Sequence, residues 1–129
     1  MVLLQCVNAY MAAQSMMDME LDYQTAYAVV ALRRELRGAV EFYQKEERRL
    51  LEEYAARDDK GKIIWSESGR FVLQDPGKAE EYEVRRRELG TVDVQKEFSP
   101  LRVPEPEKIR PAILEALDGF LIFGEEETA

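Results

Sequence analysis

The sequence predicts a single domain with a mainly helical α+β fold. Three observations support this: apolar residues at helical spacing over a long central segment, two short β-type runs around a glycine-containing loop, and a second apolar helical stripe near the C-terminus. A chain of 129 residues has the length of one domain. We assign residues 1–124 to this domain and residues 125–129 to an acidic C-terminal tail.

The first twenty residues carry almost no charge before Asp18 and are rich in methionine. We expect a short strand over Val2–Cys6 and a short helix over Val7–Met17. Clustered methionines usually fill an irregular core, because the thioether side chain is flexible and apolar. This segment is therefore predicted to pack inside the domain.

Residues 22–58 have the clearest pattern in the chain and predict one long helix. Asp22 stands where an N-cap would, and apolar residues then recur in steps of three, four and seven. They are Val29, Leu32, Leu36, Val40, Tyr43, Leu50 and Tyr54. A helix this long projects, pairs with another long helix, or breaks near Gly38, where glycine costs about 1 kcal/mol relative to alanine.

The apolar stripe of this helix is the predicted interaction face. A long amphipathic helix is stabilised mainly by packing of its apolar side, which a partner helix or another protomer supplies. We therefore expect a protein partner or a second copy of the chain on this stripe. The residues of the predicted face are Leu36, Val40, Tyr43, Leu50 and Tyr54.

A change to β-type character follows the long helix. Lys62–Trp65 and Phe71–Leu73 are short apolar runs, and a four-residue loop ending in Gly69 separates them. This arrangement predicts a β-hairpin. An isolated hairpin is only marginally stable, so we expect it to lean on the long helix or on another strand.

The rest of the chain predicts two shorter helices and one further short strand. Asp75 caps the first helix, which runs to Leu89 and stops at Gly90. Alternation over Thr91–Phe98 predicts a half-buried strand, and a proline-containing connector follows it. The last helix starts near Glu107. Its apolar side consists of Ile109, Ile113, Leu114, Leu117, Leu121 and Ile122. We find no internal repeat.

The composition argues against several classes of function. The chain has no histidine, the side chain that most often does acid–base work at neutral pH, and Cys6 is its only cysteine. A net charge of −8 is unfavourable for binding a nucleic-acid backbone, and no apolar run reaches the length of a membrane span. We expect no enzymatic activity, no cofactor, no metal, no nucleic acid and no membrane partner.

Two groups of arginines form a candidate anion-binding site. They are Arg33 and Arg37 on the long helix, and Arg85 and Arg86 on the later one. If the two helices pack antiparallel, these groups converge near Tyr43 or Tyr82, and guanidinium groups beside aromatic rings can hold a phosphate or nucleotide. Each group is interleaved with glutamates, which favours an ordinary ion-pair surface.

The order of these features is similar to that of a known family. The segments that carry the similarity are Leu50-Leu51-Glu52-Glu53-Tyr54, Arg57-Asp58-Asp59-Lys60-Gly61-Lys62-Ile63, Phe71-Val72-Leu73 and Val92-Asp93-Val94. From about Tyr23 onward, the chain resembles a family of small proteins of unassigned function from tailed phages and prophages of Gram-positive bacteria. The resemblance implies a phage setting, and we expect the cytoplasm of the host bacterial cell as the location.

We therefore expect a non-enzymatic phage accessory protein that acts through protein–protein contacts, in virion assembly or host takeover. The long helix predicts a homo-oligomer or a protein partner. The alternative is an anti-defence protein, which inhibits a host immune protein through its acidic surface or sequesters a nucleotide signal between arginines and aromatic rings.

Overall fold

The computed structural model describes residues 1–95, 98–106 and 108–124 of the chain. Within these ranges it contains helices and one two-stranded parallel sheet, so the mainly helical α+β class is confirmed. The elements in order are α1 (Leu3–Met16), α2 (Tyr23–Tyr54), the 3-10 turn η1 (Pro76–Lys78), α3 (Ala79–Gly90), β1 (Leu101–Val103), α4 (Pro111–Leu117) and β2 (Leu121–Phe123).

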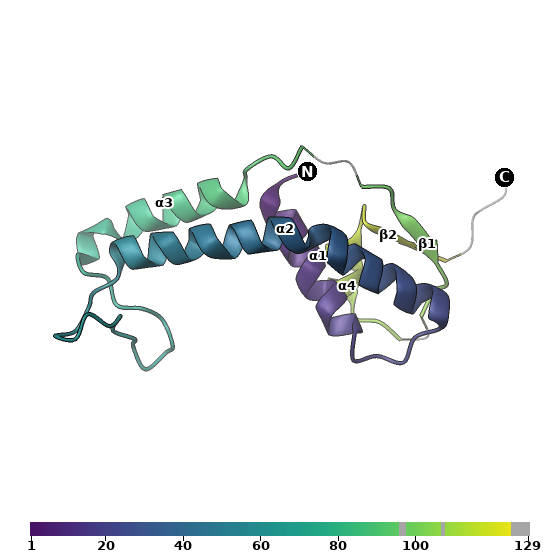
Figure 1. Cartoon of the computed structure of the whole chain (residues 1–129), viewed down its shortest axis with the longest axis horizontal. Coiled ribbons are helices and arrows are strands. Elements are labelled where there is room, and N and C mark those ends of the chain that lie inside the picture. Colours follow the sequence, from purple (N-terminus) through teal and green to yellow (C-terminus); the bar gives the residue numbers. More distant parts are fainter. Residues whose placement is uncertain (96–97, 107, 125–129) are drawn as a thin grey trace.

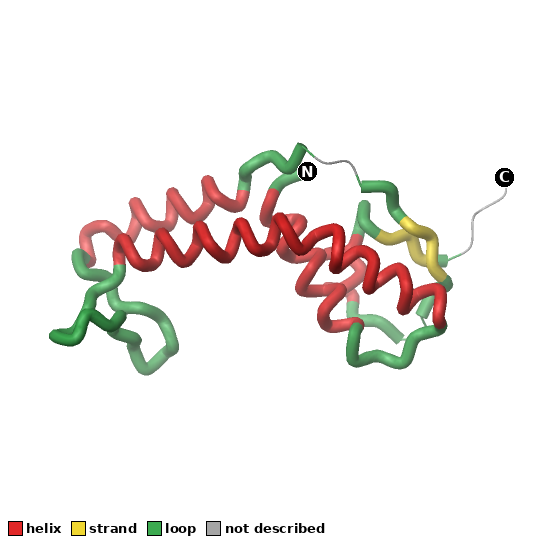
Figure 2. Tube along the Cα trace, viewed as in Figure 1, coloured by secondary structure: helices red, strands yellow, loops and turns green. Residues whose placement is uncertain are grey.

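The molecule is elongated and α2 runs along most of its length (Figure 1). The first half of α2 packs against α1 and β1, α4 packs against α1, and β2 pairs with β1; we call this end the body. The second half of α2 lies beside α3, and we call this helix pair the arm (Figure 2). Residues 55–74 connect the two arm helices at the far end of the arm, and we call them the tip.

α2 begins where the sequence predicts and ends four residues early. The Asp22 carboxylate accepts hydrogen bonds from the backbone N–H and the hydroxyl of Thr25, so the predicted N-cap is confirmed. The helix ends at Tyr54 instead of residue 58, because Ala55 adopts an extended conformation with ψ 140°. The backbone that follows pairs with other parts of the tip, and Gly38 does not break the helix.

The predicted strand over Val2–Cys6 is wrong, because α1 already begins at Leu3. The side chain of Gln5 accepts a hydrogen bond from the Val2 N–H at 2.8 Å, which supports the first turn. Val2 alone forms a bridge, antiparallel to Asp93. A short apolar run fits either a strand or a buried helix, and here helical packing against α2 decides.

The body has one apolar core, contributed by both ends of the chain. Its fully buried side chains include Met16 of α1, Leu36 of α2, Val103 of β1 and Leu117 of α4. The methionine-rich N-terminal segment therefore contributes to the core, as predicted, although Met11 and Met17 are exposed. β1 and β2 pair in parallel with Leu101 opposite Leu121.

The C-terminal segment differs from its prediction. The last helix is short, and Leu121 and Ile122, predicted to extend it, lie instead in strand β2. Gly119 has φ +84°, a conformation that L-residues rarely adopt, and it ends the helical path. The predicted helix start at Glu107 lies outside the described residues, as does the acidic tail 125–129.

Two further predictions apply to residues 75–106. The helix after Asp75 is confirmed in its extent, since η1 begins at Pro76 and α3 ends at Gly90. The strand predicted over 91–98 is wrong in its described part, where one bridge at Asp93 replaces it, and residues 96–97 lie outside the described part. The connector predicted to be extended contains strand β1.

Candidate functional site

The tip, together with the η1 turn that follows it, contains an internal repeat, which corrects our expectation that the chain has none. Residues 55–62, 63–70 and 71–78 read AARDDKGK, IIWSESGR and FVLQDPGK. Each unit of eight residues begins with two apolar residues, carries an acidic residue fifth, and ends in glycine and a basic residue. The glycines of the first two units, Gly61 and Gly69, have φ +76° and +81°, so they form the turns between units.

The three units close on one another through backbone hydrogen bonds. Ala56 N–H donates to the Val72 carbonyl at 2.7 Å, Val72 N–H to Ile64 at 2.9 Å, and Ile64 N–H to Ala56 at 3.0 Å. Three antiparallel bridges surround this ring at equivalent positions of each unit: Ala55–Leu73, Arg57–Ile63 and Trp65–Phe71. The predicted hairpin is therefore wrong in form, because three one-bridge segments make a closed triangle.

The side chains of the triangle divide between two faces. Successive side chains of an extended segment point to opposite sides, so the central residues Ala56, Ile64 and Val72 share one face. Ile64 and Val72 are exposed there. The flanking residues share the other face, where Ala55 is buried and Phe71 packs edge-on against Tyr82 of α3, with ring centroids 5.0 Å apart. The triangle is thus anchored on the arm by its inner face.

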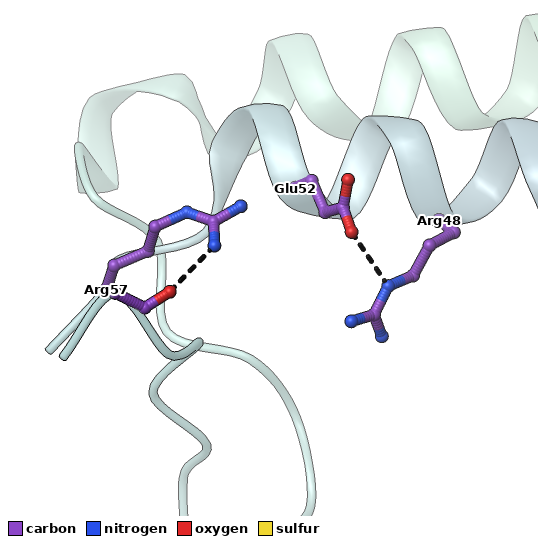
Figure 3. Close-up of polar contacts among 4 residues, drawn as sticks. Arg48, Glu52 and Arg57 are labelled. Atoms are coloured by element: carbon purple, nitrogen blue, oxygen red, sulfur yellow. Dashed lines mark hydrogen bonds and ion pairs between the residues drawn. The ribbon is translucent and has the colours of Figure 1, made fainter.

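Two exposed polar contacts stabilise the local conformation of the first turn and of the end of α2. Arg57 Nη1 donates to the Gly61 carbonyl at 2.9 Å and ties the first turn together (Figure 3). On the adjacent end of α2, Arg48 Nε pairs with Glu52 Oε1 at 3.2 Å (Figure 3). Both contacts are exposed, so they fix local conformation and contribute little to the free energy of folding.

A groove of ≈ 770 Å³ lies between the inner face of the tip and the two arm helices. Its apolar lining includes Leu51 of α2, Tyr82 of α3, and Trp65 and Phe71 of the tip. Trp65 is the only tryptophan in the chain and is 52 % exposed. Charged side chains of both signs complete the lining: Glu47, Glu83, Arg70 and Arg86. A groove that combines aromatic side chains with a few polar groups is a candidate binding site for another molecule.

Arg85 joins α3 to the end of α2 beside this groove. Its Nη1 contacts Glu53 Oε2 at 2.7 Å and the Tyr54 hydroxyl at 3.1 Å, and its guanidinium carbon lies 5.5 Å from the Tyr54 ring centroid. The hydrogen bonds that Arg85 donates to the Tyr54 hydroxyl and to the Glu53 carboxylate raise the pKa of Arg85. Arg85 is therefore occupied by partners of its own chain.

Arg86 lies between the two arm helices. Its Nη2 contacts Glu47 Oε2 at 3.4 Å. Burial and the charge of Glu47 raise the pKa of Tyr43, and burial also raises the pKa of Tyr82. The predicted convergence of Arg86 with Tyr43 and Tyr82 is thus observed, and of these three residues Arg86 and Tyr82 line the groove.

The arginines of the predicted anion site do not gather in one place. Arg33 Nη2 donates to Gln14 Oε1 of α1 at 2.7 Å, and its guanidinium carbon is 5.5 Å from the Tyr10 ring centroid. Arg33 and Tyr54 are 21 residues apart on α2, a distance of about 30 Å at 1.5 Å per residue. Arg33 therefore lies far along the helix from Arg85, and the exposed Arg37 lies about 15 Å along the helix from Glu47, the partner of Arg86.

The predicted interaction face is a core surface of the chain itself. Leu36 belongs to the body core with residues of α1, and Tyr43, Leu50 and Tyr54 belong to the cluster that α3 covers. Val40, between them on α2, is also buried. None of these five side chains is open to a partner. The stripe is apolar, as predicted, but α1 and α3 of the same chain pack on it and occupy the place expected for a partner.

Other chemistry has little support among the described residues. No group of three or more histidine, cysteine, aspartate or glutamate side chains there is arranged to hold a metal ion. Cys6 is fully buried, and this burial raises the pKa of its thiol. A buried thiol with a raised pKa is a weak nucleophile.

In the described part of the chain, no helix is both long and apolar enough to cross a membrane. Comparison of the sequence and the structure with protein-family models, curated proteins and solved structures finds no match.

Proposed function

We propose that this protein is a non-enzymatic accessory protein that acts through protein–protein contact, and that the tip and its groove form the contact site. The phage setting belongs to this proposal through the resemblance of the sequence. The observation that carries the proposal is Trp65, a large aromatic side chain left 52 % exposed beside a groove with aromatic and charged lining at the end of a projecting arm. Tryptophan is among the residues most enriched in binding hot spots.

The construction of the tip supports the same proposal. A closed ring of backbone hydrogen bonds holds Ile64 and Val72 in place without a core beneath their side chains. Pre-organised apolar side chains lose little conformational freedom on binding, which favours association. The tip thus has the properties of a rigid contact surface.

The groove sets limits on the ligand. Its volume of ≈ 770 Å³ accommodates several side chains of a partner segment. Arg70 and Glu83 in its lining offer charged hydrogen-bond partners of both signs. A partner segment that combines an apolar side chain with flanking charges fits this surface. The separation of the arginines favours this reading over sequestration of a nucleotide.

Affinity purification from the cells that produce the protein tests the proposal. The chain is recovered as wild type, as Trp65→Ser, and as the control Leu114→Ser, which alters a partly exposed apolar residue of the body. We expect one co-purifying protein with the wild type and with the control, and its loss with Trp65→Ser. Equal recovery with all three, or no co-purifying protein with the wild type, contradicts the proposal.

A further inference from the structure

The outward face of α2 carries aromatic side chains that the described part of the chain leaves uncovered. Tyr23 is 96 % exposed, Tyr27 73 % and Phe42 49 %. The buried residues of α2 lie on the other side of the helix, because at 3.6 residues per turn their positions fall opposite this face. Three large exposed side chains along one helix mark a candidate contact surface.

Gly38 lies on this face between Tyr27 and Phe42, and in the described part of the chain no atom fills the space beside it. A Cβ atom at Gly38 would meet no heavy atom within 4 Å, and the backbone there is helical. Inside a helix, glycine is less favourable than every other residue except proline. A glycine allows another molecule to approach the backbone closely. The face therefore has room for a second helix at its centre.

The charges on either side of Gly38 complement those of a second copy of α2 that runs antiparallel to the first. Arg34 lies about one turn before Gly38 and Glu41 nearly one turn after it, and neither forms an ion pair in the described part of the chain. In an antiparallel pair with its two-fold axis at Gly38, Arg34 faces Glu41 and Phe42 of the second copy. The symmetry makes this contact twice.

A parallel pair lacks this match. It would place Arg34 against Arg34 and Lys45 against Lys45 of the second copy, and like charges at these positions repel. The antiparallel pair also brings Tyr27 opposite Arg49 of the second copy, which allows a cation–π contact. Aromatic and arginine side chains are enriched in protein interfaces.

We propose that a second copy of this chain packs antiparallel across the outward face of α2, with the two-fold axis at Gly38. This dimer uses the side of α2 opposite the buried stripe, so it replaces the predicted oligomer contact with a different surface. It does not depend on the tip, which stays free at the two far ends of the pair.

A charge swap tests the dimer. The dissociation constant is measured by sedimentation over micromolar to millimolar concentrations for the wild type, Arg34→Glu, Glu41→Arg and the double variant. We expect a dimer, about tenfold or greater weakening in each single variant, and recovery in the double variant, because each single change creates two repulsive pairs and the double change restores both. Glu67→Arg, an equal charge change on the tip, is the control and leaves the constant unchanged.

A second variant separates the interface from general stability. Gly38→Ala is expected to raise the melting temperature of the monomer, since alanine favours the helix, and to weaken self-association, since its methyl group keeps the second helix away. A chain that is monomeric at every concentration overturns the proposal, as does a double charge swap without recovery. Loss of self-association in Trp65→Ser would place the second copy at the tip and also overturn it.

Discussion

The guanidinium of Arg85 is held against Tyr54, the last residue of α2, by a 3.1 Å hydrogen bond to the hydroxyl and by the face of the ring. Tyr54 also packs edge-on against Tyr82 of α3, with ring centroids 5.5 Å apart. These contacts join the two arm helices at the point where the tip begins, and they keep the groove wall in place.

Replacing Tyr54 by phenylalanine tests this joint. The ring packing survives, but the acceptor for Arg85 is lost, so we expect the free energy of unfolding to fall by about 1 kcal/mol. Urea denaturation followed by circular dichroism measures the change. Tyr27→Phe, which alters a hydroxyl on an exposed ring, is the matched control. Equal stability of Tyr54→Phe and the wild type would show that the hydrogen bond does not form in solution.

Leu36→Ala tests whether the apolar stripe of α2 is an internal core. Leu36 is fully buried, so we expect a loss of about 2–5 kcal/mol in the free energy of unfolding. The same substitution at the partly exposed Leu114 costs less, because fewer contacts are removed. The two variants are compared by urea denaturation at low protein concentration. If the stripe bound a partner instead, Leu36→Ala would change the free energy of unfolding of the free chain only slightly.

Stability is expected to fall as the pH rises into the alkaline range. Burial raises the pKa of Cys6, Tyr43 and Tyr82 in the folded chain. The unfolded chain therefore ionises first, near pH 8.5 for cysteine and about 10 for tyrosine, so the contribution of these groups is complete below those values and is lost above them. Urea midpoints between pH 7 and pH 11 measure the slope.

The variant Tyr43→Phe provides the check on that slope. It removes one of the ionising groups and should flatten the decline above about pH 10 without shifting where cysteine acts. A midpoint that stays constant through this range, or rises, contradicts the assignment of these groups to buried sites.

The turn at Gly69 is expected to resist substitution. Its φ of +81° is unfavourable for L-residues, so Gly69→Ala should cost about 1–2 kcal/mol at the tip. Because the tip lies at the end of the arm, the lower local stability should appear as faster proteolysis between residues 60 and 70. Glu67→Ala in the same loop is the control. Equal cleavage rates for both variants and the wild type would contradict the turn geometry.

Local signals in the sequence located the parts of the fold that local chemistry determines. The Asp22 cap, the Pro76 helix start and the Gly90 stop all depend on neighbouring residues, and all are observed. The division of apolar residues between α4 and β2 depends instead on pairing with β1, twenty residues earlier. Periodicity alone cannot show that pairing.

The candidate site was only partly accessible from the sequence. The eight-residue repeat is visible in the spacing of Gly61, Gly69 and Gly77, each followed by a basic residue, and this signal was available. The ring that the repeat builds joins Ala56 to Val72 by backbone contacts, which side-chain patterns do not encode. Periodicity identifies the apolar stripe of α2, but it does not identify the elements that pack on the stripe.

Photo-cross-linking from position 65 tests the central claim, that the tip is the surface on which this protein meets its partner. An aromatic cross-linking amino acid, which keeps a large apolar ring at the contact, replaces Trp65 in one variant and the exposed Leu101 of the body in another, and both are activated in the cells that produce the protein. We predict an adduct with one other protein from position 65 and none from position 101. No adduct from position 65, or the same adduct from both positions, would contradict the account.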